Sequence, residues 1–136
     1  MVSAFGGGGA LGVGAHVDPD RCPCRPGDDM AYAVCCRPLL LGESRAETAE
    51  ALMRSRYTAY ALGDLAHLQR TWHPRTLPLG LVLDPQLRWT GLTVVSSVDG
   101  GAADSEGIVA FEARWESGLG ESLQRGVLRE TSAFTR

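Results

Sequence analysis

The residues best suited to chemistry are four cysteines near the N-terminus. They form two close pairs separated by ten residues, Cys22 with Cys24 and Cys35 with Cys36. Zinc binds four thiolates as a tetrahedron, and donor pairs from one short loop reach that geometry with little loss of chain entropy. A disulfide between adjacent cysteines would be strained. We therefore predict that all four cysteines bind one zinc ion. The ion would be structural, because four protein ligands leave no coordination position for a catalytic water.

Two other roles for the cysteines stay open: reduced structural thiols and a redox-active pair. The cellular compartment bears on this choice. The sequence has no run of about 18 apolar residues that could span a membrane, and its first residues lack the basic and apolar regions of a signal peptide. We therefore expect a cytoplasmic protein, in which thiols stay reduced and a metal is favoured over a disulfide.

Size and charge limit the fold and the partners. With 136 residues, 44% of them hydrophobic, the chain can bury one core with a small appendage. The formal net charge of -3 gives no reason to expect attraction to nucleic acid or to an anionic membrane. We expect neither as a partner.

The chain divides into three segments by composition. Residues 1–17 include four consecutive glycines and are predicted to be a flexible tail. Residues 18–40 contain every cysteine and several prolines, and are predicted to be an irregular loop that a metal must hold. Residues 41–136 are predicted to form one α+β domain.

Helical signals begin after the cysteines. Ser44 and Glu47 form a capping box, and the spacing of apolar residues predicts a long helix from Ser44 that Gly63 should end. Asp64 should then cap a second, short helix. The apolar residues of the long helix recur every three or four positions and should face the core; they are Ala49, Leu52, Met53, Tyr57 and Tyr60.

After a proline-rich connection the apolar period becomes two, which predicts three strands joined as an antiparallel meander. The strands are expected at about 87–98, 108–116 and 122–134. In the first strand, the apolar residues before Gly91 are out of phase with those after it. A β-bulge is therefore expected at Gly91, where it would curve the sheet.

Several motifs resemble known families. The run Cys22-Pro23-Cys24, then Tyr32, then Cys35-Cys36 resembles the SEC-C zinc motif of SecA translocation ATPases. The strings LMRSRYTAY at 52–60 and TWHP at 71–74 resemble the YchJ family of small bacterial proteins. This resemblance covers most of the chain after residue 20. It implies a SEC-C zinc loop at 18–40 and an NTF2-like domain at 41–136, a cone in which N-terminal helices close over a strongly curved antiparallel sheet.

The chain departs from the family pattern in three places. Arg25-Pro26 replaces a usual Gly-Ser in a longer loop, Arg37 replaces a usual Gly, and the chain stops at Arg136, where family members usually continue into another strand. Without that strand a sheet edge would be exposed, which invites pairing with a second chain. A homodimer is therefore among the partner arrangements that we consider.

Polar residues of the third strand are candidates for a pocket. Glu130 and Ser132 share a face with two apolar residues, so all are expected to point inward. A carboxylate removed from water needs a cation, and Arg54 and Arg56 on the long helix are the expected suppliers. Such a pair would be either a structural lock or, with Glu130 as general base, catalytic.

Aromatic side chains and one histidine complete the candidate pocket. The aromatic residues either line a ligand cavity or pack the core; they are Tyr57, Tyr60, Trp72, Trp89, Phe111 and Trp115. His73 is either an acid or base in the cavity or an ordinary hydrogen-bonding residue.

Two main functional hypotheses follow. The first is a non-enzymatic zinc-binding or adaptor protein that binds a protein partner or a small molecule. The second, which the NTF2-like resemblance implies, is a small lyase or isomerase that uses Glu130 or His73. A redox sensor that releases zinc is a third hypothesis.

Overall fold

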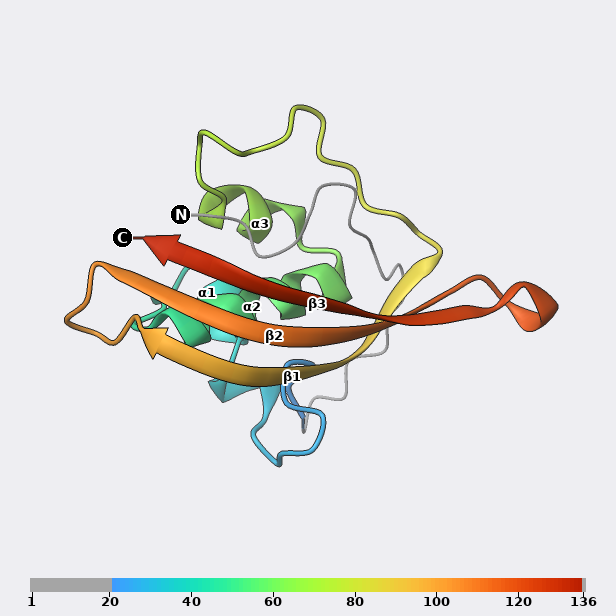
Figure 1. Cartoon of the computed structure of the whole chain (residues 1–136), viewed down its shortest axis with the longest axis horizontal. Coiled ribbons are helices and arrows are strands. Elements are labelled where there is room, and N and C mark those ends of the chain that lie inside the picture. Colours follow the sequence, from blue (N-terminus) through green and yellow to red (C-terminus); the bar gives the residue numbers. More distant parts are fainter. Residues whose placement is uncertain (1–20, 136) are drawn as a thin grey trace.

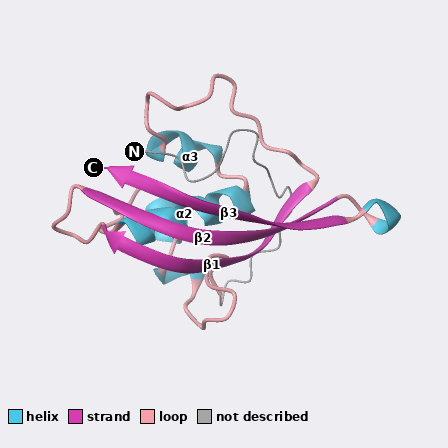
Figure 2. Cartoon of the chain, in the orientation of Figure 1, coloured by secondary structure: helices cyan, strands magenta, loops and turns pink. Residues whose placement is uncertain are grey.

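The computed structural model describes residues 21–135, so the tail predicted for residues 1–17 lies outside the described part. The helices are α1 (Arg37–Leu40), α2 (Ala49–Leu62) and α3 (Leu65–Thr71), with short turns η1 (Tyr32–Val34) and η2 (Gly120–Ser122). The strands are β1 (Leu87–Asp99), β2 (Glu106–Ser117) and β3 (Gln124–Thr135). They form an antiparallel sheet in the order β1-β2-β3, with the helices on one face (Figure 1, Figure 2). The predicted α+β fold and the meander are confirmed.

The start of α2 differs from the prediction. The helix begins at Ala49, and the Thr48 hydroxyl caps it by accepting a backbone N–H of the first turn at 3.0 Å. The predicted capping box of Ser44 and Glu47 is therefore wrong. The reason is tertiary, because the Ala49 N–H donates to the Gly100 carbonyl at 2.9 Å, and the β1–β2 loop thus satisfies a group at the helix end.

The predicted boundary between the long helix and the short one is confirmed. Gly63 ends α2 with a φ of 75°, in the left-handed region that glycine adopts without a steric penalty. Asp64 caps α3, since its carboxylate accepts the His67 N–H at 3.0 Å. α2 therefore stops at Leu62 and a separate helix, α3, follows it. Within residues 21–135 no helix has the length and apolar content needed to cross a bilayer.

The predicted apolar stripe of α2 is buried, but so is much of the rest of that helix. Ser55, Arg56 and Thr58 have no exposed surface. The side of α2 that carries them is covered by α3 and by the cysteine loop. The helix is therefore a central element and not the amphipathic surface helix that the stripe indicated.

The sheet is irregular along β1. Its pairing with β2 shifts register between Trp89 and Gly91, which confirms the bulge predicted at Gly91. A second shift, between Val94 and Ser96, was not predicted. The β2–β3 hairpin extends beyond the helices and ends at η2 (Figure 1).

Candidate metal centre

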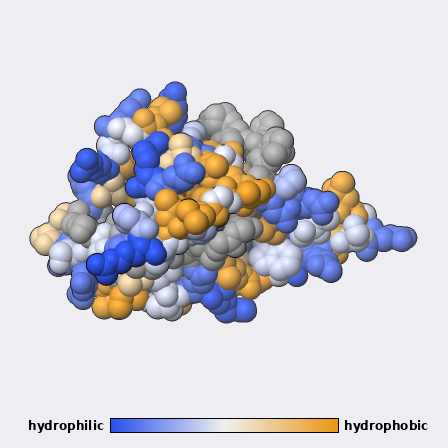
Figure 3. All heavy atoms as spheres, turned by 90° about the horizontal axis from the view of Figure 1, so that it is seen from above, coloured by the Kyte–Doolittle hydropathy of each residue, from blue (hydrophilic) through white to orange (hydrophobic). Residues whose placement is uncertain are grey.

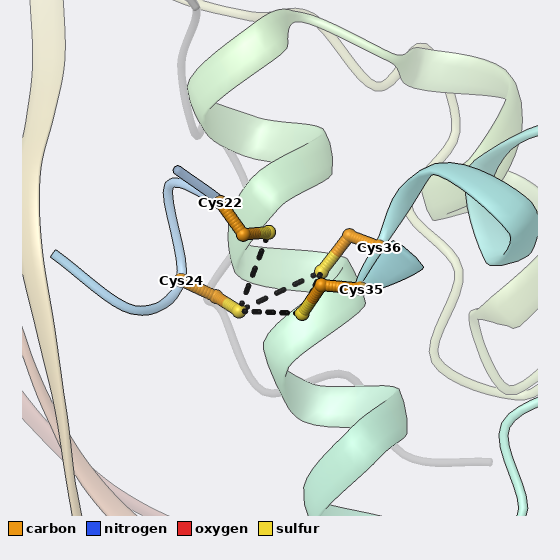
Figure 4. Close-up of side chains that lie close together, drawn as sticks. All are labelled: Cys22, Cys24, Cys35 and Cys36. Carbon is orange, nitrogen blue, oxygen red and sulfur yellow. Dashed lines mark hydrogen bonds between the residues drawn. The ribbon is translucent and has the colours of Figure 1, made fainter. Parts of the chain in front are cut away.

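The structure brings the four cysteine sulfur atoms together, and Figure 4 shows them pointing toward one another. Cys24 Sγ lies 3.6 Å from the Sγ atoms of Cys22, Cys35 and Cys36, and the Sγ atoms of Cys35 and Cys36 are 3.9 Å apart. Thiolates bound to one tetrahedral zinc ion at about 2.3 Å lie about 3.8 Å from each other. The donor set and its spacing are therefore compatible with a single metal ion.

Two local turns place the cysteine pairs. Around the first pair, the Arg25 N–H donates to the Cys22 carbonyl at 3.0 Å. The second pair lies where η1 passes into α1, and the Cys36 carbonyl accepts the first hydrogen bonds of α1. Cys22, Cys24 and Cys36 are buried, whereas Cys35 is partly exposed. Neither pair lies within a long regular element, but the segment predicted as an irregular loop contains the short helix α1 (Arg37–Leu40).

Two residues of α2, one turn apart, tie the cysteine loop to the domain. Arg54 Nη1 donates to the Cys24 carbonyl at 2.8 Å. The Thr58 hydroxyl donates to Cys36 Sγ at 3.2 Å and lies 3.7 Å from Cys22 Sγ. Hydrogen bonds to sulfur from outside the donor set orient metal ligands and adjust their basicity. Sequence reasoning missed Thr58, because a threonine within a helix gives no local signal of such a role.

The electrostatics of the cluster favour thiolate at some positions and not at others. Hydrogen bonds from Cys24, Cys35 and Cys36 hold the pKa of Cys22 below its ordinary value. Contacts with the other thiols and burial raise the pKa of Cys24 and Cys36. Burial works to lower the pKa of Arg25, but its hydrogen bond with Cys35 and the nearby thiolate charge raise it. Arg25 thus places a positive charge beside the cysteine cluster.

The predicted pocket residues of α2 and β1 lie mostly in the packed core. Tyr57 and Tyr60 are buried and meet the Trp89 ring edge-on, with centroids 6.3 Å apart in each pair. Arg56 donates to the Thr71 hydroxyl at 2.6 Å and lies over the Trp72 ring. Burial lowers the pKa of Arg56 to about 10. These contacts join α2 to α3.

The other predicted site residues lie on the sheet and on the connection after α3. On β3, the Ser132 hydroxyl donates to Glu130 Oε2 at 3.3 Å. Trp115 lies against Gly126, where a Cβ would meet its ring at 2.4 Å. His73 Nδ1 accepts the Arg75 N–H at 3.1 Å. The catalytic roles considered for Glu130 and His73 stay predictions.

A cavity of about 900 Å³ lies among α1, α2, α3, the α1–α2 connection and the end of β3. Trp72 is the member of the predicted pocket set that lines it. Its other polar lining includes Ser55, His67 and Arg70, none of which the sequence singled out. Ser55 and His67 are 12 residues apart and meet only because α3 folds back on α2.

His67 is a buried, neutral member of this cavity. Its side chain is 3% exposed, and Nε2 lies 2.9 Å from the Ser55 hydroxyl. That hydroxyl also donates to the Leu52 carbonyl at 2.7 Å, and its oxygen can accept a hydrogen bond from a protonated Nε2. Burial, helped by the charge of Arg70, lowers the pKa of His67 to about 4.

Acidification should destabilise the fold through His67. The folded chain has a His67 pKa of about 4 against 6.5 for a free imidazole, so between these values the unfolded chain binds a proton that the folded chain does not. Stability is then full above pH 6.5 and falls as the pH drops toward 4, by about 2 kcal/mol between pH 7 and pH 5. Urea unfolding of the wild type and of His67→Gln at both pH values measures this, since the variant should lose about that part of the pH dependence. Equal pH dependence in both proteins would contradict the assignment.

Comparison with known proteins agrees with this arrangement. Residues 48–136 match the family model described as YchJ, middle NTF2-like domain. A UPF0225 protein of Streptomyces coelicolor is 47% identical over 115 residues, which are 85% of this chain and 85% of the relative. A UPF0225 protein of Cupriavidus metallidurans is 46% identical over 104 residues, 76% of this chain and 70% of the relative.

A solved structure agrees as well. The solution structure of a SEC-C motif containing protein from Rhodopseudomonas palustris matches with a TM-score of 0.67 and 33% sequence identity, covering 85% of this chain and 88% of that chain. Fold and cysteine cluster together define a small α+β protein in which a cysteine loop precedes an NTF2-like domain. The chain belongs to the YchJ-like family.

Proposed function

We propose that this protein is a zinc-dependent binding module, in which one structural zinc ion fixes the cysteine loop on the NTF2-like domain. The observation that carries the proposal is the meeting of four cysteine Sγ atoms within 4.8 Å of one another. The residues that would hold the ion are Cys22, Cys24, Cys35 and Cys36. Zinc would supply a cross-link between two parts of a loop that has little regular structure of its own.

The donor set fits a structural ion. Four thiolates fill a tetrahedral zinc site, so no position is left for water or substrate. The likeness to a solved SEC-C motif containing protein supports this assignment. Free thiols persist in a reducing compartment, so the proposal places the protein in the cytoplasm.

Elemental analysis tests the zinc proposal directly. Protein prepared without chelator should contain one zinc per chain, and cobalt in place of zinc should give the absorption spectrum of a tetrahedral tetrathiolate site. Cys36→Ser should lose that spectrum. Folded protein with far less than one metal per chain, or an unchanged cobalt spectrum in the variant, would contradict the proposal.

The binding role is proposed for a protein partner. Apolar side chains gather on the face of the molecule shown in Figure 3. The connection between α3 and β1 exposes Leu77, Leu79 and Val82, and Leu79 is fully exposed. Exposed apolar surface of this kind is typical of interaction sites. In this proposal the zinc loop acts as a support of the domain and takes no part in a reaction.

Two double variants test whether partner binding depends on the exposed apolar residues of the α3–β1 connection and not on the metal. Leu79→Asp with Val82→Asp should abolish capture of the partner while zinc content and melting temperature stay at wild-type values. The control is Val95→Asp with Val98→Asp, which changes exposed apolar residues on β1. Equal loss of capture in the control would show that the effect is not specific to the α3–β1 connection.

Removing the Thr58 hydroxyl should weaken zinc binding about tenfold with little change in fold, because the hydrogen bond to Cys36 Sγ is lost while the volume is kept. Thr58→Val is the variant, and competition with a chromophoric chelator measures the affinity. Thr131→Val, at an exposed position on β3, is the matched control and should keep wild-type affinity. Wild-type affinity in Thr58→Val would show that the contact does not influence the metal.

A further inference from the structure

The cavity between α2 and α3 has the size of a site for a small organic molecule. Its volume is about 900 Å³, whereas drug-sized ligands occupy roughly 300 to 1,000 Å³. Its lining comes from α1, the α1–α2 connection, α2, α3 with the residues that follow it, and the end of β3. The zinc cluster is not part of its lining.

The charge of the lining is positive. Arg45 and Arg70 line the cavity, and none of its described lining residues is Asp or Glu. Arg70 Nη2 donates to the Leu40 carbonyl at 2.9 Å, which fixes the guanidinium at the rim and leaves its other N–H groups available. Arg45 is exposed and forms no ion pair within residues 21–135. Among the described residues, the cavity lining therefore carries two cations and no carboxylate.

The interior of the cavity is neutral and largely apolar. Leu39, Leu52 and Trp72 contribute apolar surface. The polar groups further in are the Ser55–His67 pair and the Thr71 hydroxyl, and His67 is held neutral by burial. An anionic group is thus favoured at the rim, next to the arginines, and an uncharged body is favoured inside.

We propose that this cavity binds a small organic anion, with a carboxylate or phosphate group on Arg45 and Arg70 and an apolar body against Leu52 and Trp72. The positive charge of the described lining residues disfavours a metal cation. A free inorganic anion would leave most of the volume empty. The proposal goes beyond the protein-partner role proposed above, and it depends neither on the zinc ion nor on the α3–β1 connection.

The test uses three probes with the same aromatic body: 1-naphthoate, 1-naphthyl phosphate and the neutral 1-naphthylmethanol. Titration of the zinc-loaded, isotope-labelled chain, followed by amide chemical shifts, gives the affinity and the location of each. At least one anion should bind about tenfold more tightly than the alcohol, with shifts in α3 and in residues 42–46. The tighter anion identifies the carboxylate or the phosphate as the preferred group.

Variants assign the binding to the arginines. Arg70→Gln and Arg45→Gln should each weaken the preferred anion about tenfold and leave the alcohol unchanged. Arg45 is exposed and forms no hydrogen bond or ion pair within residues 21–135. Its variant therefore tests the proposal even where Arg70→Gln loses the bond to Leu40 and folds poorly. Arg125→Gln, which loses an ion pair with Glu116 on the β2–β3 hairpin, is the control and should bind like the wild type.

Three results would overturn the proposal. They are anion binding weaker than about 10 mM, equal affinity for anion and alcohol, or wild-type anion affinity in both arginine variants of the cavity. Zinc content measured on the same samples distinguishes a failure of the anion proposal from a failure of the proposed metal site. The double variant Leu79→Asp with Val82→Asp should bind the anion normally. Its behaviour therefore distinguishes failure of the anion site from failure of the proposed protein-binding surface on the α3–β1 connection.

Discussion

Replacing Cys36 with serine should remove the metal and lower the free energy of unfolding by about 4 kcal/mol in the presence of excess zinc. A ligand that binds only the folded state contributes about that much at a free concentration 1,000-fold above its Kd. The variant leaves three thiols, of which Cys22 and Cys24 are almost fully buried. The Cys36 carbonyl still caps α1, so the change acts on the sulfur and not on the helix.

Urea unfolding followed by tryptophan fluorescence, with and without chelator, measures this effect. Chelator should destabilise the wild type to about the level of Cys36→Ser and should leave the variant unchanged. That pattern assigns the loss to the metal, because a purely structural thiol would make the variant and the chelator act independently. Wild-type stability of Cys36→Ser in excess zinc would refute the metal site.

Gly107→Val should destabilise the fold by about 3 kcal/mol, at the upper end of the cost of overpacking. Gly107 is buried on β2, and a Cβ there would lie 2.5 Å from the Gly100 Cα and 2.9 Å from the Ala49 Cβ. The closer neighbour is backbone, which cannot rotate away. The β1–β2 loop would have to move, and the hydrogen bond from the Ala49 N–H to the Gly100 carbonyl, which holds the start of α2, would be lost.

Gly27→Val is the matched control for this prediction. Gly27 is exposed, and a Cβ at that position would meet no heavy atom within 4 Å. Its midpoint of urea unfolding should stay close to that of the wild type, whereas the midpoint of Gly107→Val should fall. Equal stabilities of the two variants would show that the β1–β2 loop is not tightly packed on α2.

Features with local causes were predictable from the residues alone. Gly63 ends a helix and Asp64 caps the next one because both effects act within a few residues. The bulge at Gly91 follows from a change of phase within one strand. The convergence of the cysteines was expected from two tight pairs in a short loop, where few backbone arrangements keep the pairs apart.

Features that join distant segments were decided by the tertiary structure. The start of α2 depends on Gly100, the Thr58 hydroxyl reaches Cys36 across 22 residues, and Arg70 binds Leu40 across 30 residues. A threonine, a histidine or an arginine in a helix has the same local pattern whether its side chain meets solvent, a thiol or a carbonyl. Packing of α2 between the sheet, α3 and the cysteine loop selects among these partners, because burial of the whole core outweighs the preference of any single residue.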